Sequence, residues 1–294
     1  MIEQSVTTHN IAKERMESII RLIPEFVPFH GKDNGLYRRF SEITEAYFTD
    51  FEGDVIDIHP CDGLVWPHTS LGNLTSYNFF CSFDEWLLYS FYWVNRGRYQ
   101  TVMDIGANIG IDSIILNKLG YDVHSFEPDP QLFEQFMHLS KLNNCQGIKA
   151  HNKAMSDSAG VAEFVRVRGN TTANHIKGVR EFYGEADFLE VETVTFQELS
   201  VKPDLIKINT EGHEATIVAS ISLDDWQTID AFVEIHNDRN GELVFKHFQG
   251  SDMNIFSQGL GWQKINSLEE MPVTNKVGYV FVSSKPEMPW SPVN

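Results

Sequence analysis

Two acidic residues and a glycine turn are the residues of this chain whose types and spacing could bind a ligand. Asp104 lies at the end of the apolar run TVMDI, and Gly106 and Gly110 follow at a spacing that lets a strand turn directly into a helix. Glu127 follows the next strand-like run, DVHSF, and Pro128 stops the strand from continuing. In a βαβ unit the two acids would lie at neighbouring strand ends above a glycine turn.

This arrangement favours a nucleoside that carries positive charge. A carboxylate after the second strand can accept hydrogen bonds from ribose hydroxyls. Asn108 stands where a pyrophosphate-binding turn has its second glycine, and we expect the Asp104 carboxylate to face the pocket and repel phosphate. The sulfonium and ammonium groups of S-adenosylmethionine would suit such a pocket. The alternative is a turn that only caps a strand in some other α/β protein.

From residue 100 onward, strand-like and helix-like runs alternate, which predicts an α/β fold with a doubly wound parallel sheet. We expect core strands at 101–105, 122–126, 147–155, 205–208 and 229–235, helices at 111–119, 130–143 and 243–258, and a closing pair at 262–265 and 278–283. Two further strand-like runs, 162–167 and 189–195, flank the polar segment 168–186, whose length is typical of a lid or binding loop.

The first third of the chain predicts a helical and hairpin extension without a motif of its own. We expect helices at 11–24, 37–51 and 83–96, a hairpin at 54–66 and a polar loop at 69–78. The dense aromatic residues of this part are typical of a core. The predicted boundary separates residues 1–98, the extension, from residues 99–294, the sheet domain. We expect loop 67–80 to be the part of the extension that contacts substrate.

Ligands of open α/β sheets bind outside the carboxyl ends of the strands, and several polar side chains of this chain fall there. Methyl transfer from a sulfonium to oxygen needs alignment of the two reactants and one base. Candidate bases are Glu211, His213 and His236, of which His236 has the most useful unperturbed pKa. Each histidine could equally be a hydrogen-bonded structural residue, and Glu211 could be a carboxylate near a helix N-terminus.

The same strand ends could hold a divalent ion that lowers the pKa of an acceptor hydroxyl. The residues in question are Asn209, Glu211, Glu234, His236 and Asp238. No compact ligand motif supports this alternative, so we expect a site without metal.

Composition excludes several classes of partner. The 294 residues carry a net charge of −18, which argues against binding to nucleic acid or anionic lipid. Cys61, Cys81 and Cys145 are scattered, which indicates a reducing compartment and no zinc ribbon. The start of the chain has no signal-peptide pattern, and no window approaches the apolar length of a membrane span. We therefore expect a cytoplasmic protein.

Several motifs together resemble the FkbM family of S-adenosylmethionine-dependent methyltransferases. They are VMDIGANIGIDS, HSFEPDPQLFEQF, NKAMSDSAG, IKINTEGHEATIV and FVEIH, in the family's order over residues 99–283. The resemblance implies a class I Rossmann-like sheet of seven strands whose last strand is antiparallel. It also implies O-methylation of a hydroxyl on a sugar, glycan, lipid-linked sugar or other small natural product.

The resemblance also implies roles for particular residues. The turn from Asp104 to Gly110 would hold the methionine part of the cofactor, Glu127 the ribose, and Glu211 would border the reacting centre. The residues expected to bind cofactor are Asp104, Gly106, Ala107, Asn108, Gly110, Glu127, Pro128, Lys153, Ala154, Met155 and Asn209.

One position departs from the family pattern. The family's fourth strand typically ends K-I-D-x-E-G, whereas this chain has Asn209 in place of the acid. Asparagine can hydrogen-bond the cofactor but cannot act as a base. Asn209 motivates one alternative to an active methyltransferase, and the similarity of the sheet to that of other nucleotide-binding enzymes leaves a second. The first is a nucleoside-binding pseudo-enzyme without methyl transfer, and the second is a nicotinamide-dependent oxidoreductase, which Asn108 disfavours.

Overall fold

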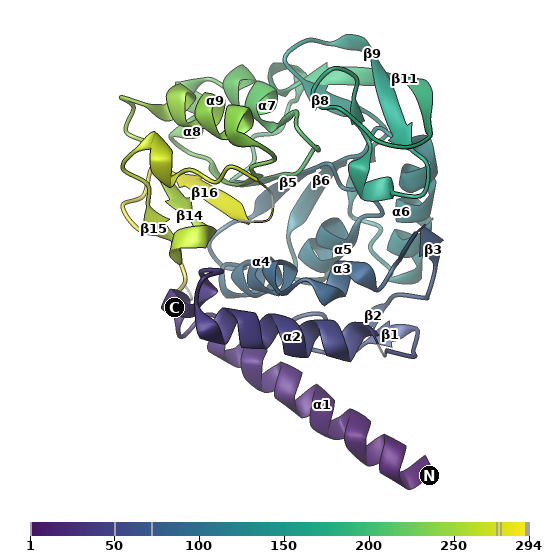
Figure 1. The fold of residues 1–294 in the computed structure, drawn as a ribbon. Helices are drawn as coiled ribbons and strands as arrows, with labels where there is room; N and C mark the ends of the chain where they lie inside the picture. The colour runs from purple at the N-terminus through teal and green to yellow at the C-terminus, as the bar shows by residue number, and fades with distance from the viewer. Residues whose placement is uncertain (1, 50, 72, 275, 277, 292–294) are drawn as a thin grey trace.

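A mixed sheet organises the chain from Thr101 onward in the computed structural model, which describes residues 2–49, 51–71, 73–274, 276 and 278–291 (Figure 1). Among these residues the strand order is β15-β14-β16-β13-β12-β5-β6-β7. The strands are β5 (Thr101–Ile105), β6 (Asp122–Phe126), β7 (Lys149–His151), β12 (Leu205–Ile208), β13 (Asp230–Glu234), β14 (Asn254–Ser257), β15 (Gln263–Lys264) and β16 (Tyr279–Ser283).

Strands β13, β12, β5, β6 and β7 pair in parallel. Strand β16 is antiparallel to both of its neighbours, β13 and β14. The predicted class I methyltransferase sheet, with its antiparallel last strand, is therefore confirmed. The two-residue strand β15 adds an eighth strand at one edge.

Helices cover both faces of this sheet because its strands are apolar on both sides. Val102 of β5 packs in one hydrophobic cluster with α4 (Phe83–Val94), α5 (Ile111–Lys118) and α6 (Pro130–Leu142). The next residue, Met103, packs in another cluster with α7 (Glu214–Ser220), α8 (Leu223–Trp226) and α9 (Asp238–Phe248). Successive side chains of a strand point to opposite faces, which explains the division.

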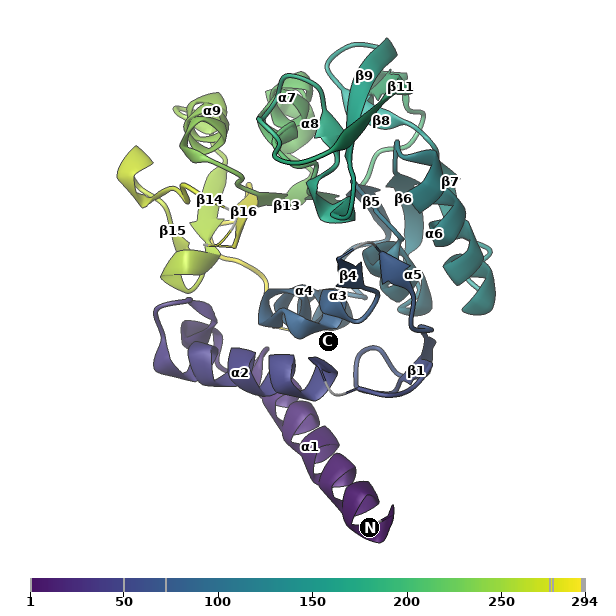
Figure 2. The same cartoon turned by 45° about the vertical axis from the view of Figure 1, so that its right-hand side comes forward.

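The N-terminal part has α1 (Ile2–Leu22), α2 (Gly35–Thr49), α3 (Asn78–Cys81) and α4, with the two short hairpins β1 (Val55–Ile56)–β2 (Leu64–Val65) and β3 (Ser70–Leu71)–β4 (Leu74–Thr75). The expected polar loop at 69–78 is therefore wrong in part, since it contains β3 and β4. The Phe91 ring of α4 lies 4.8 Å from the Phe232 ring of β13, so the extension and the sheet share one hydrophobic cluster. Figures 1 and 2 show α1 directed away from the rest of the molecule.

A second, smaller sheet follows β7 and contains β8 (Ala154–Ser156), β9 (Gly160–Val167), β10 (His175–Ile176) and β11 (Ala186–Thr195). Both views show it next to α7, on the side of the large sheet away from α1 and α2 (Figure 2). The single strand predicted at 147–155 is wrong, because the chain leaves the large sheet after His151. Asn152 turns the chain there by donating its side-chain amide to the carbonyl oxygens of Glu127 and Pro128.

The predicted C-terminal elements also need correction. The helix expected at 243–258 ends at Phe248, and Asn254–Ser257 is strand β14. Gly250, with φ of 80°, turns the chain between them in a conformation that favours glycine. The expected pairing of 262–265 with 278–283 is wrong, since β14 lies between β15 and β16.

The remaining short 3₁₀ turns are η1 (Val27–His30), η2 (Thr171–Ala173), η3 (Phe196–Glu198), η4 (Gln258–Leu260) and η5 (Leu268–Glu270). None of the described helices combines the length and the apolar character that a membrane crossing requires.

Candidate active site

A cavity of about 290 Å³ lies at the carboxyl ends of β5, β6, β12 and β13. The sheet contributes strand-end residues such as Glu127 and Asn209 to its lining. The N-terminal part contributes Phe79 and Glu85, and the segment between β9 and β11 contributes Thr172. Three parts of the chain that are far apart in sequence thus enclose one site.

The glycine turn after β5 fits closely against its neighbours. Gly106 has φ of 83°, and a Cβ atom there would overlap the carbonyl oxygen of Asn209. Gly110 has φ of 84°, and a Cβ atom there would overlap the Phe136 ring of α6. The first glycine therefore allows contact with the end of β12, and the second allows contact between α5 and α6. Gly106, Ala107 and Asn108 line the cavity, whereas Gly110 does not.

Glu127 lies where the sequence predicted the ribose acceptor. Its Oε2 accepts a hydrogen bond from the Asn108 backbone N–H and its Oε1 from the Asp129 backbone N–H, both at 2.8 Å. Each carboxylate oxygen has a further lone pair for a ribose hydroxyl. Burial raises the pKa of this carboxyl to about 7, so its charge changes near neutral pH.

This pKa predicts a pH dependence of nucleoside binding. The ionised carboxylate accepts two hydroxyl donors, and protonation removes acceptor capacity, so affinity is retained above pH 7 and lost as the pH falls through the pKa of about 7. We expect the calorimetric affinity for S-adenosylhomocysteine to fall about tenfold from about pH 8 to about pH 6. Glu127→Gln should bind more weakly with a flatter profile. If the affinity of Glu127→Gln depended on pH as steeply as that of the wild type, Glu127 would not be the residue that accepts the ribose hydroxyls.

Asp104 does not face the cavity, and this expectation from the sequence is wrong. Its side chain is buried, accepts a hydrogen bond from Ser113 Oγ at 2.6 Å, and lies 3.4 Å from Lys207 Nζ. The same ammonium lies 3.3 Å from Asp112 Oδ2. Lys207 and Asp104 are cross-strand partners of β12 and β5, so the strand register places their charges together. Burial opposes the charged form of Lys207, but Asp104 and Asp112 raise its pKa.

The cavity is nevertheless acidic. Among its described lining residues Lys207 is the single lysine or arginine, and the carboxyl groups are Glu85, Asp112, Glu127, Glu211 and Glu234. Burial raises the pKa of Glu85 and of Glu234, because charge is disfavoured away from water. A positively charged ligand would compensate this excess of carboxyl groups.

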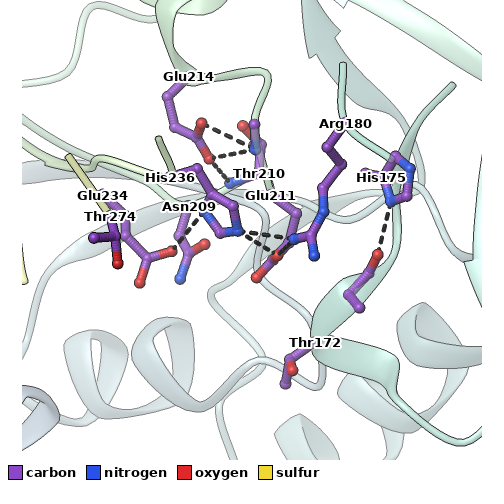
Figure 3. A network of polar contacts seen from close by, with 12 residues as sticks. Thr172, His175, Arg180, Asn209, Thr210, Glu211, Glu214, Glu234, His236 and Thr274 are labelled. Atoms are coloured by element: carbon purple, nitrogen blue, oxygen red, sulfur yellow. Dashed lines mark hydrogen bonds and ion pairs between the residues drawn. The ribbon is translucent and has the colours of Figure 1, made fainter. Parts of the chain in front are cut away.

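The loop after β12, which hydrogen bonds to Glu214 hold in place, directs Glu211 into the cavity. Glu211 has φ of 58°, an uncommon conformation for a residue other than glycine. The buried Glu214 carboxylate accepts hydrogen bonds from the backbone N–H groups of Thr210 and Gly212, at 2.8 and 3.0 Å (Figure 3). The Asn240 side-chain amide also donates to Glu214, at 3.1 Å, which ties the loop to α9. Glu214 thus maintains the backbone that positions Glu211.

Glu211, His236 and Arg180 form a polar network at this end of the cavity (Figure 3). His236 Nε2 lies 2.7 Å from Glu211 Oε2, and His236 Nδ1 lies 3.5 Å from Glu234 Oε2. Arg180, between β10 and β11, pairs with Glu211 and lies 2.8 Å from His236 Nε2. Glu211 lines the cavity, whereas His236 contacts it through Glu211.

The charges of this network control the protonation of His236. Burial by itself lowers the pKa of the imidazole. Hydrogen bonds to Glu211 and Glu234 raise this pKa by more than burial lowers it, so the resulting pKa is about 10. Arg180 can donate to Nε2 only when that nitrogen carries no proton. Arg180 and a proton therefore compete for Nε2, and the position of Arg180 decides whether His236 is neutral.

The other predicted residues divide into those that line the cavity and one that does not. His213 lines it, lies 2.9 Å from Ser156 Oγ through Nε2, and has its pKa lowered by burial. The remaining predicted residues that line the cavity are Pro128, Ala154, Met155 and Asn209. Lys153 instead pairs with Glu192 at 2.9 Å on the exposed side of the small sheet.

Sequence reasoning missed two cations of the site. Lys207 could have been noticed as a lysine inside the buried strand LIKI. Arg180 has no such signal, because its segment lacks a motif and only the folded chain brings it to Glu211.

Comparison with known proteins agrees with this geometry. The model of the methyltransferase FkbM domain matches residues 104–263, which is more than half of the chain. The chain belongs to the FkbM methyltransferase family. Methyltransferase 1 of Beauveria bassiana (strain ARSEF 2860) is 24% identical over 167 residues, which cover 49% of this chain and 67% of that protein.

Two solved structures are similar to this FkbM methyltransferase at low identity. A ribosomal protein L11 methylase from Lactobacillus delbrueckii subsp. bulgaricus has a TM-score of 0.36 at 12% identity, over 66% of this chain and 75% of that chain. A precorrin-6y C5,15-methyltransferase from Geobacter metallireducens GS-15 has a TM-score of 0.36 at 11% identity, over 65% and 82%.

As an FkbM methyltransferase the protein uses S-adenosylmethionine, and the lining of the cavity fits this cofactor. Glu127 offers free lone pairs where a ribose would bind. Apolar side chains suited to an adenine ring line the same cavity, namely Phe126, Leu132, Met155, Phe164 and Ile176. The excess of carboxyl groups suits a sulfonium. When bound, the cofactor supplies an activated methyl group.

Proposed function

We propose that this methyltransferase acts on a hydroxyl oxygen of a sugar, a glycan or another small natural product. The observation that carries the proposal is the Glu211–His236 pair, with its 2.7 Å contact, at the cavity that also contains Glu127. An acceptor hydroxyl is a poor nucleophile until it loses its proton, and a carboxylate–imidazole pair is suited to remove it.

The proposed reaction is an in-line displacement. The acceptor oxygen forms a bond to the methyl carbon while the bond from that carbon to sulfur breaks, and the sulfur keeps the electron pair. Glu211, which lines the cavity, orients the hydroxyl, and the hydroxyl proton passes to the Glu211–His236 pair. Arg180 must leave His236 Nε2 for that nitrogen to accept the proton.

The rest of the cavity supports a neutral polyhydroxyl acceptor. Its lining includes amide and hydroxyl side chains that can both donate and accept hydrogen bonds, namely Asn78, Ser82, Thr171, Thr172, Asn174 and Tyr279. The net charge of −18 disfavours a nucleic-acid substrate. The cysteines Cys61, Cys81 and Cys145 are all free thiols, which supports a reducing, cytoplasmic location as part of this proposal.

Two measurements test the proposal. Calorimetry with S-adenosylhomocysteine should show binding of one nucleoside per chain, and radiolabelled methyl transfer to a panel of glycosides and free sugars should show an O-methyl product. No binding at millimolar ligand would overturn the cofactor assignment. Binding without transfer to any hydroxyl acceptor, unchanged in Asn209→Asp, would overturn O-methylation and favour a nucleoside-binding pseudo-enzyme.

A further inference from the structure

We propose that Glu85, a residue of α4 in the N-terminal part of the chain, binds the ammonium group of S-adenosylmethionine. Asp104, which the sequence predicted to face the positively charged ligand, lies beside Lys207 instead, so another carboxylate must face it. The inference rests on the use of this cofactor and does not depend on the identity of the methyl acceptor. It gives the N-terminal part, which precedes the matched family domain, a direct role in cofactor binding.

Glu85 differs from the other carboxyl groups of the cavity because it has no close partner. It makes no ion pair within the described part of the chain, and the Tyr279 hydroxyl donates to its Oε1 over a long distance of 3.5 Å. A positive group or backbone N–H groups hold each of the other four. These pairs are Asp112 with Lys207, Glu127 with the N–H groups of Asn108 and Asp129, Glu211 with Arg180 and His236, and Glu234 with His236.

The surroundings of Glu85 favour a positively charged ligand. Burial raises the pKa of this carboxyl well above its usual range. Asp112, Asp84 and Glu234 raise the pKa further, whereas Lys207 lowers it. A carboxylate away from water is costly unless a positive charge accompanies it, so the group stays protonated or pairs with a cation. An ammonium bound beside Glu85 would supply the counter-charge that the protein itself does not place there.

Glu85 lies at the end of the cavity that the methionine part of the cofactor would reach. Glu127, the expected ribose acceptor, follows β6, whereas Glu85 is close to Lys207 of β12 and Tyr279 of β16. Strand β5 lies between β6 and β12 in the sheet. A ligand that contacts both Glu127 and Glu85 therefore crosses the end of β5, where the glycine turn lines the cavity. The methionine chain extends from the ribose and ends in the ammonium and carboxylate groups, so a ribose at Glu127 directs the ammonium toward Glu85.

The hydrogen-bonding capacity of Glu85 suits the ammonium better than the sulfonium of the same cofactor. An ammonium has three N–H donors, whereas a sulfonium has none. Glu85 Oε2 accepts no hydrogen bond from the described residues, and Oε1 accepts the long one from Tyr279. Hydrogen bonds between charged groups are stronger and more directional than a contact of charge alone. The two carboxylate oxygens can therefore fix the orientation of the ammonium as well as balance its charge.

The test compares two ligands by calorimetry on the full chain, without acceptor. One is S-adenosylhomocysteine, and the other is its desamino analogue, in which a hydrogen atom replaces the ammonium group. The wild type should bind S-adenosylhomocysteine about tenfold or more tightly than the analogue, the effect typical of a hydrogen bond to a charged group. Glu85→Gln keeps the shape of the side chain and removes its charge. It should lose about tenfold in affinity for S-adenosylhomocysteine and change little in affinity for the analogue.

Asp84→Asn is the matched control, because Asp84 precedes Glu85 in α4 but pairs with Lys32 at 2.7 Å and does not line the cavity. It should leave the ratio of the two affinities unchanged. Equal affinity of the wild type for the two ligands would overturn the inference, as would an equal loss of both ligands in Glu85→Gln or the same change of ratio in Asp84→Asn. Binding of the analogue by the wild type shows that the nucleoside site is intact, so failure here is distinguishable from failure of the cofactor assignment or of hydroxyl methylation.

Discussion

Lys207→Met is expected to lower the free energy of unfolding by about 3–5 kcal/mol, since it removes the positive partner of two buried carboxylates. Asp104 Oδ1 and Asp112 Oδ2 lie 3.4 and 3.3 Å from Lys207 Nζ. The Lys207 side chain is only 6% exposed, so water cannot replace the ammonium. Urea denaturation followed by circular dichroism measures the loss.

Two further variants separate charge from packing. Asp104→Asn combined with Lys207→Met removes one of the two unpaired carboxylates and should recover part of the lost stability. Lys202→Met is the matched control, because Lys202 is largely exposed and pairs with Asp225 at the surface. We expect it to change stability by no more than about 0.5 kcal/mol. A Lys207→Met protein as stable as Lys202→Met would contradict the prediction.

His236→Ala is expected to lower kcat for methyl transfer by about 10²–10⁴-fold, the range typical of a residue required for proton removal. The loss follows from its 2.7 Å contact with Glu211, with which it activates the acceptor. Affinity for S-adenosylhomocysteine should change little, because Glu127, the residue that we expect to bind the ribose, does not contact His236. Steady-state kinetics and calorimetry on the same preparation measure the two effects.

His213→Ala is the informative comparison, since His213 is also a candidate base and lines the cavity. Its Nε2 lies 2.9 Å from Ser156 Oγ, which fixes the ring to the small sheet rather than to Glu211. We expect a smaller loss of kcat than for His236→Ala. If His213→Ala lowered kcat more than His236→Ala, His213 rather than His236 would be the base. His138→Ala, on the exposed side of α6, should have no effect on kcat.

Local sequence was sufficient to predict the strands and turns that form the cofactor end of the cavity. The run at 101–105 is apolar on both faces, and its position in a βαβ pattern predicts a buried parallel strand. Gly106 adopts the positive φ that glycine permits, and Pro128 follows the end of β6. These features depend on neighbouring residues and backbone geometry, so Glu127 could be placed at the cavity before the fold was known.

Local sequence was misleading where the chain passes from the large sheet to the smaller sheet. The sequence predicted one strand over residues 147–155, yet β7 ends at His151 and β8 begins at Ala154 in the smaller sheet. The break depends on hydrogen bonds from Asn152 to the chain near Glu127, about 25 residues earlier. Composition carries no information about such a partner.

The sequence by itself determined the α/β fold, the family and the set of polar residues at the strand ends, because these follow from periodicity, glycine and proline geometry, and contiguous motifs. The tertiary structure alone decided which charges meet. Strand register pairs Asp104 with Lys207 and turns that carboxylate away from the cavity. The path of a connection without a motif brings Arg180 to Glu211 and His236. Charge pairs of this kind depend on distances between atoms far apart in the chain, which only the folded backbone defines.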